Sequence, residues 1–241
     1  MVCDTVDQNE LLNLFATLNN NKSPGPDTIG PRLIKEIQHS ILDPLLHIIN
    51  LSFSSGVFPD LLKIAKVVPI YKKEDRSLMS NYRPISLLNV ISKLIEKLMH
   101  KRLYSFLMKN NILYKYQFGF RKFFSTTLAL IEVIDNLIQN MENGNTSVGV
   151  YLDLQKAFNT VNHQNCLSQN EYGVRGTVHD WFTSYLCNRK QYTVIGQSEL
   201  QTITCGIPQG SVLGHLLFLM YVNDIHKAVP DVNLRLFADD N

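Results

Sequence analysis

The chain has 241 residues, of which 45% are hydrophobic and 18% charged. This composition is ordinary for one large domain or two subdomains, and it supports a sizeable core. No apolar run reaches the roughly 18 residues of a membrane-spanning helix, and the acidic N-terminus does not resemble a signal peptide. We therefore expect an intracellular protein, in nucleus or cytoplasm, without a membrane segment. The four cysteines lack the paired spacing of a zinc site and fit a reducing compartment.

The formal net charge of +2 hides an uneven distribution. Between Lys63 and Lys122, 14 Lys and Arg residues stand against three acidic ones, whereas the rest of the chain holds nine basic and 18 acidic residues. A basic block of this kind is typical of a surface that binds a polyanion. The alternative is a solvated helix face, which is a natural role for Lys93, Lys97, Lys101 and Arg102.

Hydrophobic periodicity predicts the elements in chain order. They are a helix over 6–18, a turn-rich loop over 22–27, a helix from Pro31, a helix over 41–53, a strand over 66–71, a polar loop over 72–81, helices over 90–106 and 127–141, a strand over 147–154, helices near 161 and over 181–186, a hairpin of 192–195 with 200–204, a helix over 212–225 and a strand over 234–238. Pro69 places the first strand at an edge or bulge. Because helices and strands mix without a regular alternation, we expect the α+β class.

Two of the predicted strands end in carboxylates. Asp239 and Asp240 follow the terminal run, and Asp153 lies at the far end of the 147–154 run, opposite its apolar side chains. Adjacent like charges repel, and a divalent cation with oxygen ligands removes that penalty. If the two strands are neighbours, three carboxylates converge, which is the minimum for a two-metal phosphoryl or nucleotidyl transfer site. The alternative is a solvated Asp-Asp turn after a short strand.

Six blocks resemble the reverse transcriptases of non-LTR (LINE-type) retrotransposons, in the family's order and over nearly the whole chain. They are NKSPGPD at 21–27, NYRPISLL at 81–88, QFGFR at 117–121, LDLQKAF at 152–158, GIPQGSVLG at 206–214 and FADD at 237–240. The resemblance implies a right-hand polymerase of the α+β class, with an N-terminal extension and fingers over 1–145 and a palm over 146–241, whose antiparallel sheet is flanked by helices. The implied activity is RNA-directed DNA synthesis from an RNA template, a DNA primer and deoxynucleoside triphosphates, with two Mg²⁺ ions, for which Mn²⁺ can substitute.

The resemblance also assigns roles to individual residues. Those implied to bind metal and to be catalytic are Asp153, Asp239 and Asp240. Those implied to bind the nucleotide are Lys72, Lys73, Arg83, Phe158, Gln209 and Gly210. Those implied to contact the template are Gln117, Arg121 and Ser125. Within this set, Phe158 is similar to the aromatic gate that excludes a ribose 2′-hydroxyl; its alternative is a core aromatic. A solvated surface role is the alternative for Lys72 and Lys73, and spacing does not show which of the two reaches the triphosphate.

The chain also departs from the family pattern. Asn159 and Asn162 stand where aspartates are usual, His215 stands where proline is typical, and the usual leucine-rich helix before Gly173 is degraded. The sequence stops one residue after Asp240, before the returning strand and the thumb, so we expect no polymerisation by this chain alone. A catalytically inactive nucleic-acid-binding remnant is the alternative function. A group II intron maturase fits the palm blocks but not those at 23–27 and 81–85. Nothing in the sequence indicates an oligomeric state.

Overall fold

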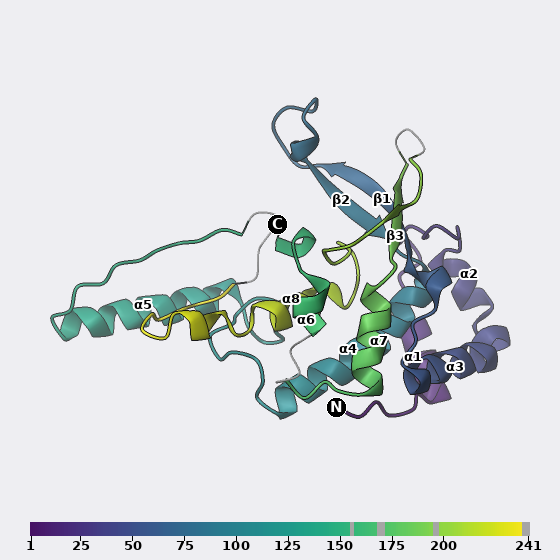
Figure 1. Cartoon of the computed structure of the whole chain (residues 1–241), viewed down its shortest axis with the longest axis horizontal. Helices are drawn as coiled ribbons and strands as arrows, with labels where there is room; N and C mark the ends of the chain where they lie inside the picture. Colours follow the sequence, from purple (N-terminus) through teal and green to yellow (C-terminus); the bar gives the residue numbers. More distant parts are fainter. Residues whose placement is uncertain (155–156, 168–171, 195–197, 238–241) are drawn as a thin grey trace.

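A computed structural model describes residues 1–154, 157–167, 172–194 and 198–237 (Figure 1). The α-helices are α1 (Gln8–Ala16), α2 (Pro31–Glu36), α3 (Gln38–Ser55), α4 (Val90–Lys109), α5 (Thr126–Glu142), α6 (His163–Leu167), α7 (Thr177–Leu186) and α8 (Gly214–Val222). The strands are β1 (Ile64–Tyr71), β2 (Tyr82–Leu87), β3 (Lys190–Thr193) and β4 (Gln201–Thr202). The short 3-10 helices are η1 (Asp60–Lys63), η2 (Met79–Asn81), η3 (Ala157–Asn159) and η5 (Ile225–Ala228). The α+β class predicted from the sequence is confirmed.

The sheet has the strand order β2-β1-β3-β4. β1 pairs antiparallel with β2 over its outer part and parallel with β3 only from Ile64 to Val67, and β3 pairs antiparallel with β4. Pro69 lies beyond the part of β1 that β3 covers, opposite Pro84 of β2. The edge or bulge position predicted for this strand is wrong, because β1 lies inside the sheet between β2 and β3. Pro69 is tolerated there because β3 pairs only with Ile64 to Val67, so no third strand requires the missing amide. β2 itself was not predicted, since Pro84 interrupts a short stretch of mixed polar and apolar residues.

A core around Trp181 joins the N-terminal helices to α7. The indole of Trp181 is fully buried, stacks on Tyr185 at 5.6 Å between centroids, and meets the edges of Phe53 at 5.7 Å and Phe58 at 5.4 Å. Its Nε1 donates to Ser52 Oγ over 3.0 Å, so the one polar atom of the ring is satisfied. The segment before the sheet thus belongs to the same core as α7.

Part of the basic segment is neutralised inside the protein. Arg102 of α4 pairs with Glu10 of α1 at 2.8 Å, and Lys101 pairs with the same carboxylate at 2.9 Å. Burial alone would raise the pKa of Glu10, but the hydrogen bonds and charges of Arg102 and Lys101 outweigh it and lower that pKa. Lys63 is buried and donates to Asp60 over 2.7 Å. Arg102 and Lys63 are largely buried and committed to these pairs, whereas Lys101 stays exposed to solvent.

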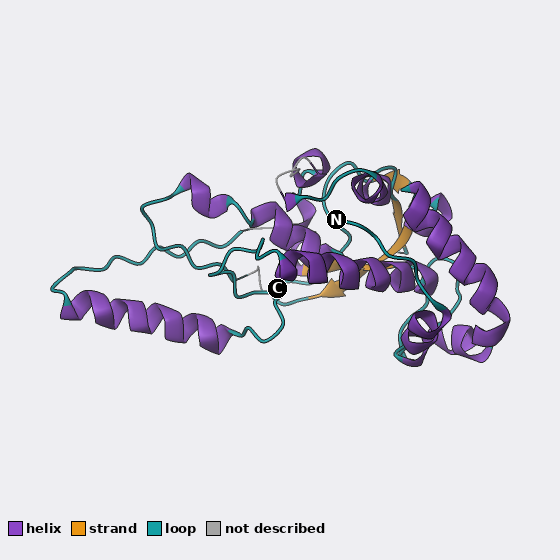
Figure 2. Cartoon of the chain, turned by 90° about the horizontal axis from the view of Figure 1, so that it is seen from below, coloured by secondary structure: helices purple, strands orange, loops and turns teal. Residues whose placement is uncertain are grey.

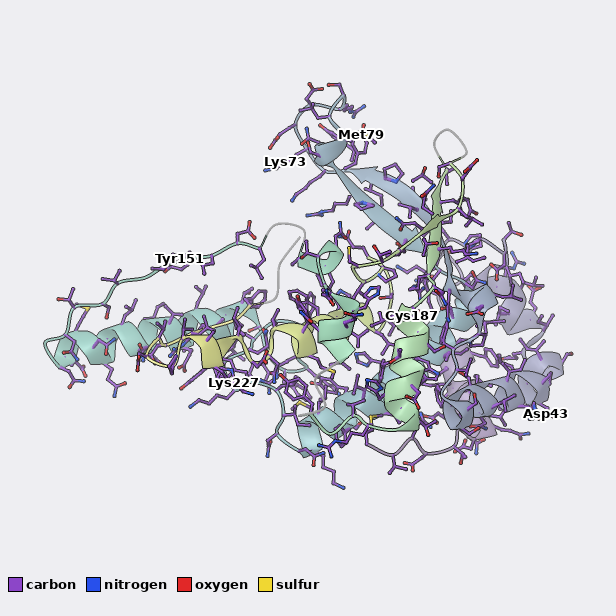
Figure 3. The ribbon with its side chains drawn as sticks, viewed as in Figure 1. Asp43, Lys73, Met79, Tyr151, Cys187 and Lys227 are labelled. Atoms are coloured by element: carbon purple, nitrogen blue, oxygen red, sulfur yellow. The ribbon has the colours of Figure 1, made fainter. Side chains whose placement is uncertain are left out.

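α5 and the segment after it extend away from this body (Figures 1 and 2). α5 begins at its cap Ser125 and has no buried residue. The strand predicted over 147–154 is not formed: the segment is extended and exposed, with Tyr151 pointing into solvent (Figure 3). The run before Asp239 makes a single parallel bridge, Leu236 with Gln117. An extended run becomes a strand only when a neighbour bonds its backbone, and within the described residues 147–154 has none. No helix in the described part of the chain combines the length and apolar character needed to cross a membrane.

Candidate nucleotide and template site

A glycine-bounded turn over residues 206–213 lies between β2 and η3. Gly206 has φ +84° and Gly210 has φ +114°, backbone conformations that residues with a Cβ rarely adopt. A Cβ on Gly210 would lie 2.7 Å from the carbonyl oxygen of Ser86, and one on Gly206 would lie 2.7 Å from that of Asn159. Both glycines are therefore required by the close approach of backbone to backbone.

Backbone hydrogen bonds connect this turn to both neighbours. The amide of Ser86 in β2 donates to the carbonyl of Gln209 over 2.7 Å, and the amide of Ile207 donates to the carbonyl of Phe158 over 2.8 Å. The Gln209 side chain donates from Nε2 to Asn159 Oδ1 over 3.4 Å. Three sequence blocks that are far apart in the chain, those at 81–88, 152–158 and 206–214, therefore meet at one place.

A hollow of about 230 Å³ opens beside the turn. Its lining includes Pro84, Ser86, Asn159, Gln191, Cys205 and Gln209. The amide side chains among these can both donate and accept hydrogen bonds, whereas the prolines supply apolar surface. Such a mixture suits a ligand that has a flat apolar part and a polar edge.

Phe158 lies under the turn in an aromatic cluster. It is 9% exposed, and its ring centroid lies 4.8 Å from Phe218, 5.6 Å from His215 and 5.9 Å from Phe120. Burial lowers the pKa of His215, which favours its neutral form among these rings. The burial fits a core aromatic, and the bond from Ile207 to the Phe158 carbonyl fits a gate beside the turn.

The three basic candidates for triphosphate binding lie on the β1–β2 hairpin, which projects from the body (Figure 3). Lys72 and Lys73 are exposed just beyond β1, where the Lys72 amide donates to the Asn81 carbonyl over 2.9 Å. Lys73 forms an exposed ion pair with Glu74 at 3.4 Å. Arg83 in β2 is half-buried, and its Nε has no hydrogen-bond partner within the described residues. An unpaired cationic donor of this kind is suited to an anion.

The candidate template residues have contacts within the protein. Gln117 is buried, and its Oε1 accepts from the amide of Gly119 over 3.0 Å. Arg121 donates from Nη1 to the carbonyls of Tyr114 and Gln117, each over 3.1 Å. Ser125 caps α5 by accepting from the amide of Leu128 over 3.2 Å. These contacts shape the loop before α5, and template binding by the three side chains stays a prediction.

Of the three carboxylates predicted to hold metal, the structure describes one. Asp153 is exposed on the segment after α5, and no hydrogen bond or ion pair joins it to another described residue. Asp239 and Asp240 lie outside the described residues. Within the described ranges, no group of three or more His, Cys, Asp or Glu side chains is arranged to hold a metal. A free carboxylate such as that of Asp153 has the oxygen donors that Mg²⁺ requires, so this residue fits the ion, and the convergence of all three stays a prediction.

Sequence reasoning missed residues that support this site through tertiary contacts. Ser86 and Asn159 bond the turn directly, and Glu96 of α4 accepts from the amide of Val212 over 2.6 Å. No role was predicted for Glu96, which was counted only as one of the three acidic residues in the basic segment. The one available indication was its place between Ile95 and Leu98 in the apolar pattern of that helix.

The comparison with protein families decides the identity of the chain. The family model for "Reverse transcriptase (RNA-dependent DNA polymerase)" matches residues 70–241, from within β1 onward. The chain belongs to the reverse transcriptase family. Members of this family generally use divalent metal ions. The resemblance to reverse transcriptases that the six blocks indicated is confirmed.

Curated reverse transcriptases of mobile elements match almost the whole chain. It is 32% identical to "RNA-directed DNA polymerase from mobile element jockey" of Drosophila melanogaster, over 96% of this chain and 26% of that protein. It is 31% identical to "Probable RNA-directed DNA polymerase from transposon BS" of the same species, over 96% of this chain and 27% of that protein. A third relative is "Retrovirus-related Pol polyprotein from type-1 retrotransposable element R1" of Bradysia coprophila, 30% identical over 91% of this chain and 22% of that protein. The chain spans about a quarter of the length of these relatives.

Proposed function

We propose that the chain forms the fingers and palm of an RNA-directed DNA polymerase of a non-LTR retrotransposon. The fingers correspond to residues 1–145 and the palm to 146–241. Its partners are an RNA template, a DNA primer and deoxynucleoside triphosphates. The observation that carries the proposal is the convergence of β2, η3 and the 206–213 turn, which brings Phe158, Gln209 and Gly210 together.

Each part of this arrangement has a task in nucleotide binding. Gln209 presents an amide to the sugar or base, and the glycines beside it let backbone approach the ligand closely. Lys72, Lys73 and Arg83 on the hairpin approach the triphosphate, the lysines as point charges and the arginine through its planar fork. Phe158 limits the space at the sugar. All of these residues position the substrate before any bond is made.

The carboxylates of Asp153, Asp239 and Asp240 would hold two Mg²⁺ ions. When bound, the ions activate the primer 3′-hydroxyl and neutralise the leaving pyrophosphate. The contribution of Asp153 itself is an exposed carboxylate free of competing contacts with the described residues. The antiparallel palm sheet expected from the family would bring the run before Asp239 beside the segment that ends at Asp153.

A specific observation also favours the second candidate, a nucleic-acid-binding remnant without catalysis. Asp153 lies on a segment that no neighbouring strand holds in the described structure. Catalysis tolerates little misplacement, since an error of about 1 Å can cost on the order of a hundredfold. A remnant of this kind would bind template and primer but would not select a nucleotide.

Nucleotide-dependent stabilisation of the template–primer complex distinguishes the two. The chain is bound to a labelled RNA template with a dideoxy-terminated DNA primer, so that the next nucleotide binds without reacting. If the chain has a polymerase site, the complementary deoxynucleotide with Mg²⁺ should lengthen the lifetime of the protein–template–primer complex about tenfold. The Asp153→Ala variant should not show this longer lifetime. Asp135→Ala, which removes an exposed aspartate of α5, is the matched control and should keep it. Binding that no nucleotide stabilises would support the remnant instead.

A further inference from the structure

Glu96 is a fully buried carboxylate at the end of the 206–213 turn. It lies in α4 among Leu94, Ile95 and Leu98, and its side chain has no exposed surface. Burying a carboxylate is costly unless hydrogen bonds and charges compensate. Glu96 receives this compensation from the charge of Arg189 and from backbone amides in the segment that follows Gly210.

The carboxylate of Glu96 receives backbone donors from the start of α8. Its Oε2 accepts from the amide of Val212 over 2.6 Å and from that of Leu213 over 3.4 Å, and its Oε1 accepts from Ser92 Oγ over 3.2 Å. Leu213 is the N-cap of α8 and has no side-chain cap of its own. A carboxyl oxygen at this helix end satisfies amides that would otherwise lack partners.

Other buried groups complete the surroundings of Glu96. Burial raises the pKa of Glu96 above its usual value, and the positive charge of Arg189 and the amides of Val212 and Leu213 offset only part of that rise. Arg189 is fully buried, lies over the Tyr185 ring at 4.7 Å and donates from Nη1 to the Tyr185 carbonyl over 3.0 Å. Arg189 thus supplies the compensating charge from the start of β3.

The turn is therefore held at both sides of Gln209. On one side, the Ser86 amide of β2 bonds the Gln209 carbonyl over 2.7 Å. On the other, Glu96 fixes the amide of Val212, three residues farther along the chain. Between them the Ser211 amide donates to the Pro208 carbonyl over 3.0 Å. Both attachments restrain the backbone of the segment that carries Gln209.

We propose that Glu96 is a positioning residue, whose buried carboxylate fixes the 206–213 turn so that Gln209 is presented to the incoming nucleotide. The expected effect on nucleotide binding rests on the proposed function, whereas the hydrogen bonds that Glu96 accepts from the turn do not depend on it. Glu96 does not touch the substrate. Its removal should therefore weaken nucleotide binding while leaving the template-binding surface on other elements intact.

The test compares two variants with a matched control. Glu96→Gln keeps the size of the side chain and removes its charge. The double variant Glu96→Met with Arg189→Met replaces both buried charges by apolar groups of similar volume, a change that folded proteins tolerate well. Ser92→Ala is the control, because it removes a bond to Oε1 and leaves the bonds of Oε2 with Val212 and Leu213.

Hydrogen exchange and nucleotide affinity are measured on the full chain bound to dideoxy-terminated template–primer with Mg²⁺. We expect exchange of the Val212 and Leu213 amides to quicken at least tenfold in both variants. We expect affinity for the complementary deoxynucleotide to fall about tenfold, with template–primer affinity within twofold of the parent and the Ser92→Ala control unchanged. If Glu96→Gln does not fold, the double variant decides.

Three outcomes would overturn the proposal: slow exchange in the variants, unchanged nucleotide affinity despite fast exchange, or an equal decrease in affinity in the Ser92→Ala control. If the parent chain binds no nucleotide, the proposed function fails by itself. The exchange of Val212 and Leu213 then decides alone whether Glu96 holds the turn.

Discussion

Replacing Gly210 by alanine should destabilise the protein through the turn that carries Gln209. At φ +114°, an alanine costs about 1–3 kcal/mol of backbone strain. Its Cβ would also lie 2.7 Å from the Ser86 carbonyl oxygen of β2, so the strand or the turn must shift. The hydrogen bond from the Ser86 amide to Gln209 would then be weakened, at about 0.5–1.5 kcal/mol. An alanine also restricts the unfolded chain, which offsets about 0.4–1 kcal/mol, so the net loss is about 0.5–4 kcal/mol.

Gly144→Ala is the matched control for this prediction. Gly144 also has a positive φ, +70°, but a Cβ there would meet nothing within 4 Å. The Gly144→Ala substitution should therefore lower the free energy of unfolding by about 1 kcal/mol. This is the left-handed backbone penalty minus the stabilisation that comes from restricting the unfolded chain.

The assay for both variants is urea unfolding followed by tryptophan fluorescence. The single tryptophan, Trp181, lies fully buried in the core and reports the separation of its aromatic neighbours on unfolding. If Gly210→Ala lowers the free energy of unfolding no more than Gly144→Ala does, the turn does not lie against β2 as described, and the convergence of the three blocks no longer supports a nucleotide site.

Three further predictions concern charge, sugar selection and pH. Removing Lys72, Lys73 and Arg83 together should weaken template–primer binding and lower its salt slope by roughly one for each phosphate that these cations neutralise in the parent; an unchanged slope in salt titrations would count against a role for the hairpin. Phe158→Ala should narrow the preference for deoxynucleotides over ribonucleotides in the binding assay, whereas a fixed preference identifies Phe158 as a core residue. Burial raises the pKa of Glu10, but its basic partners outweigh that effect and lower it, so its stabilisation is present above an unfolded pKa of about 4.3 and is lost as pH falls through the folded pKa. The stability difference between the parent and Glu10→Gln, measured by urea unfolding, should therefore shrink in acid, and a difference that grows there would refute the ion pair.

The spacing of apolar residues predicted those helices and strands whose own sequences repeat at helix or strand periodicity. The long helix α4 and the hairpin of β3 and β4 lie where the apolar spacing indicated them. The strand at 147–154 was predicted by the same alternation and is not formed, because a strand also needs a partner, which sequence periodicity does not contain. β2 was missed for the opposite reason: its pairing with β1 overrides the unfavourable Pro84.

The sequence predicted residues of the candidate nucleotide site, but not the residue that holds the turn in place. Family blocks pointed to Gln209, Gly210 and Phe158, which the structure brings together. Glu96 could not be recognised in this way, since its burial and its bonds to α8 depend on how α4 packs against a segment more than a hundred residues away. The place of Glu96 between Ile95 and Leu98 in the apolar pattern indicates burial but not which segment it bonds.

The most direct test of the central claim, template-directed nucleotide binding, is a four-by-four challenge with the dideoxy-terminated complex and Mg²⁺. Each of the four bases is placed in turn at the templating position of the RNA, and each of the four deoxynucleotides is offered to every complex. A polymerase site predicts that only the complementary nucleotide prolongs the lifetime of each complex, by about tenfold, so that changing the template base changes the preferred nucleotide. Stabilisation that is absent, or that is the same for all four nucleotides whatever the template base, would contradict the account.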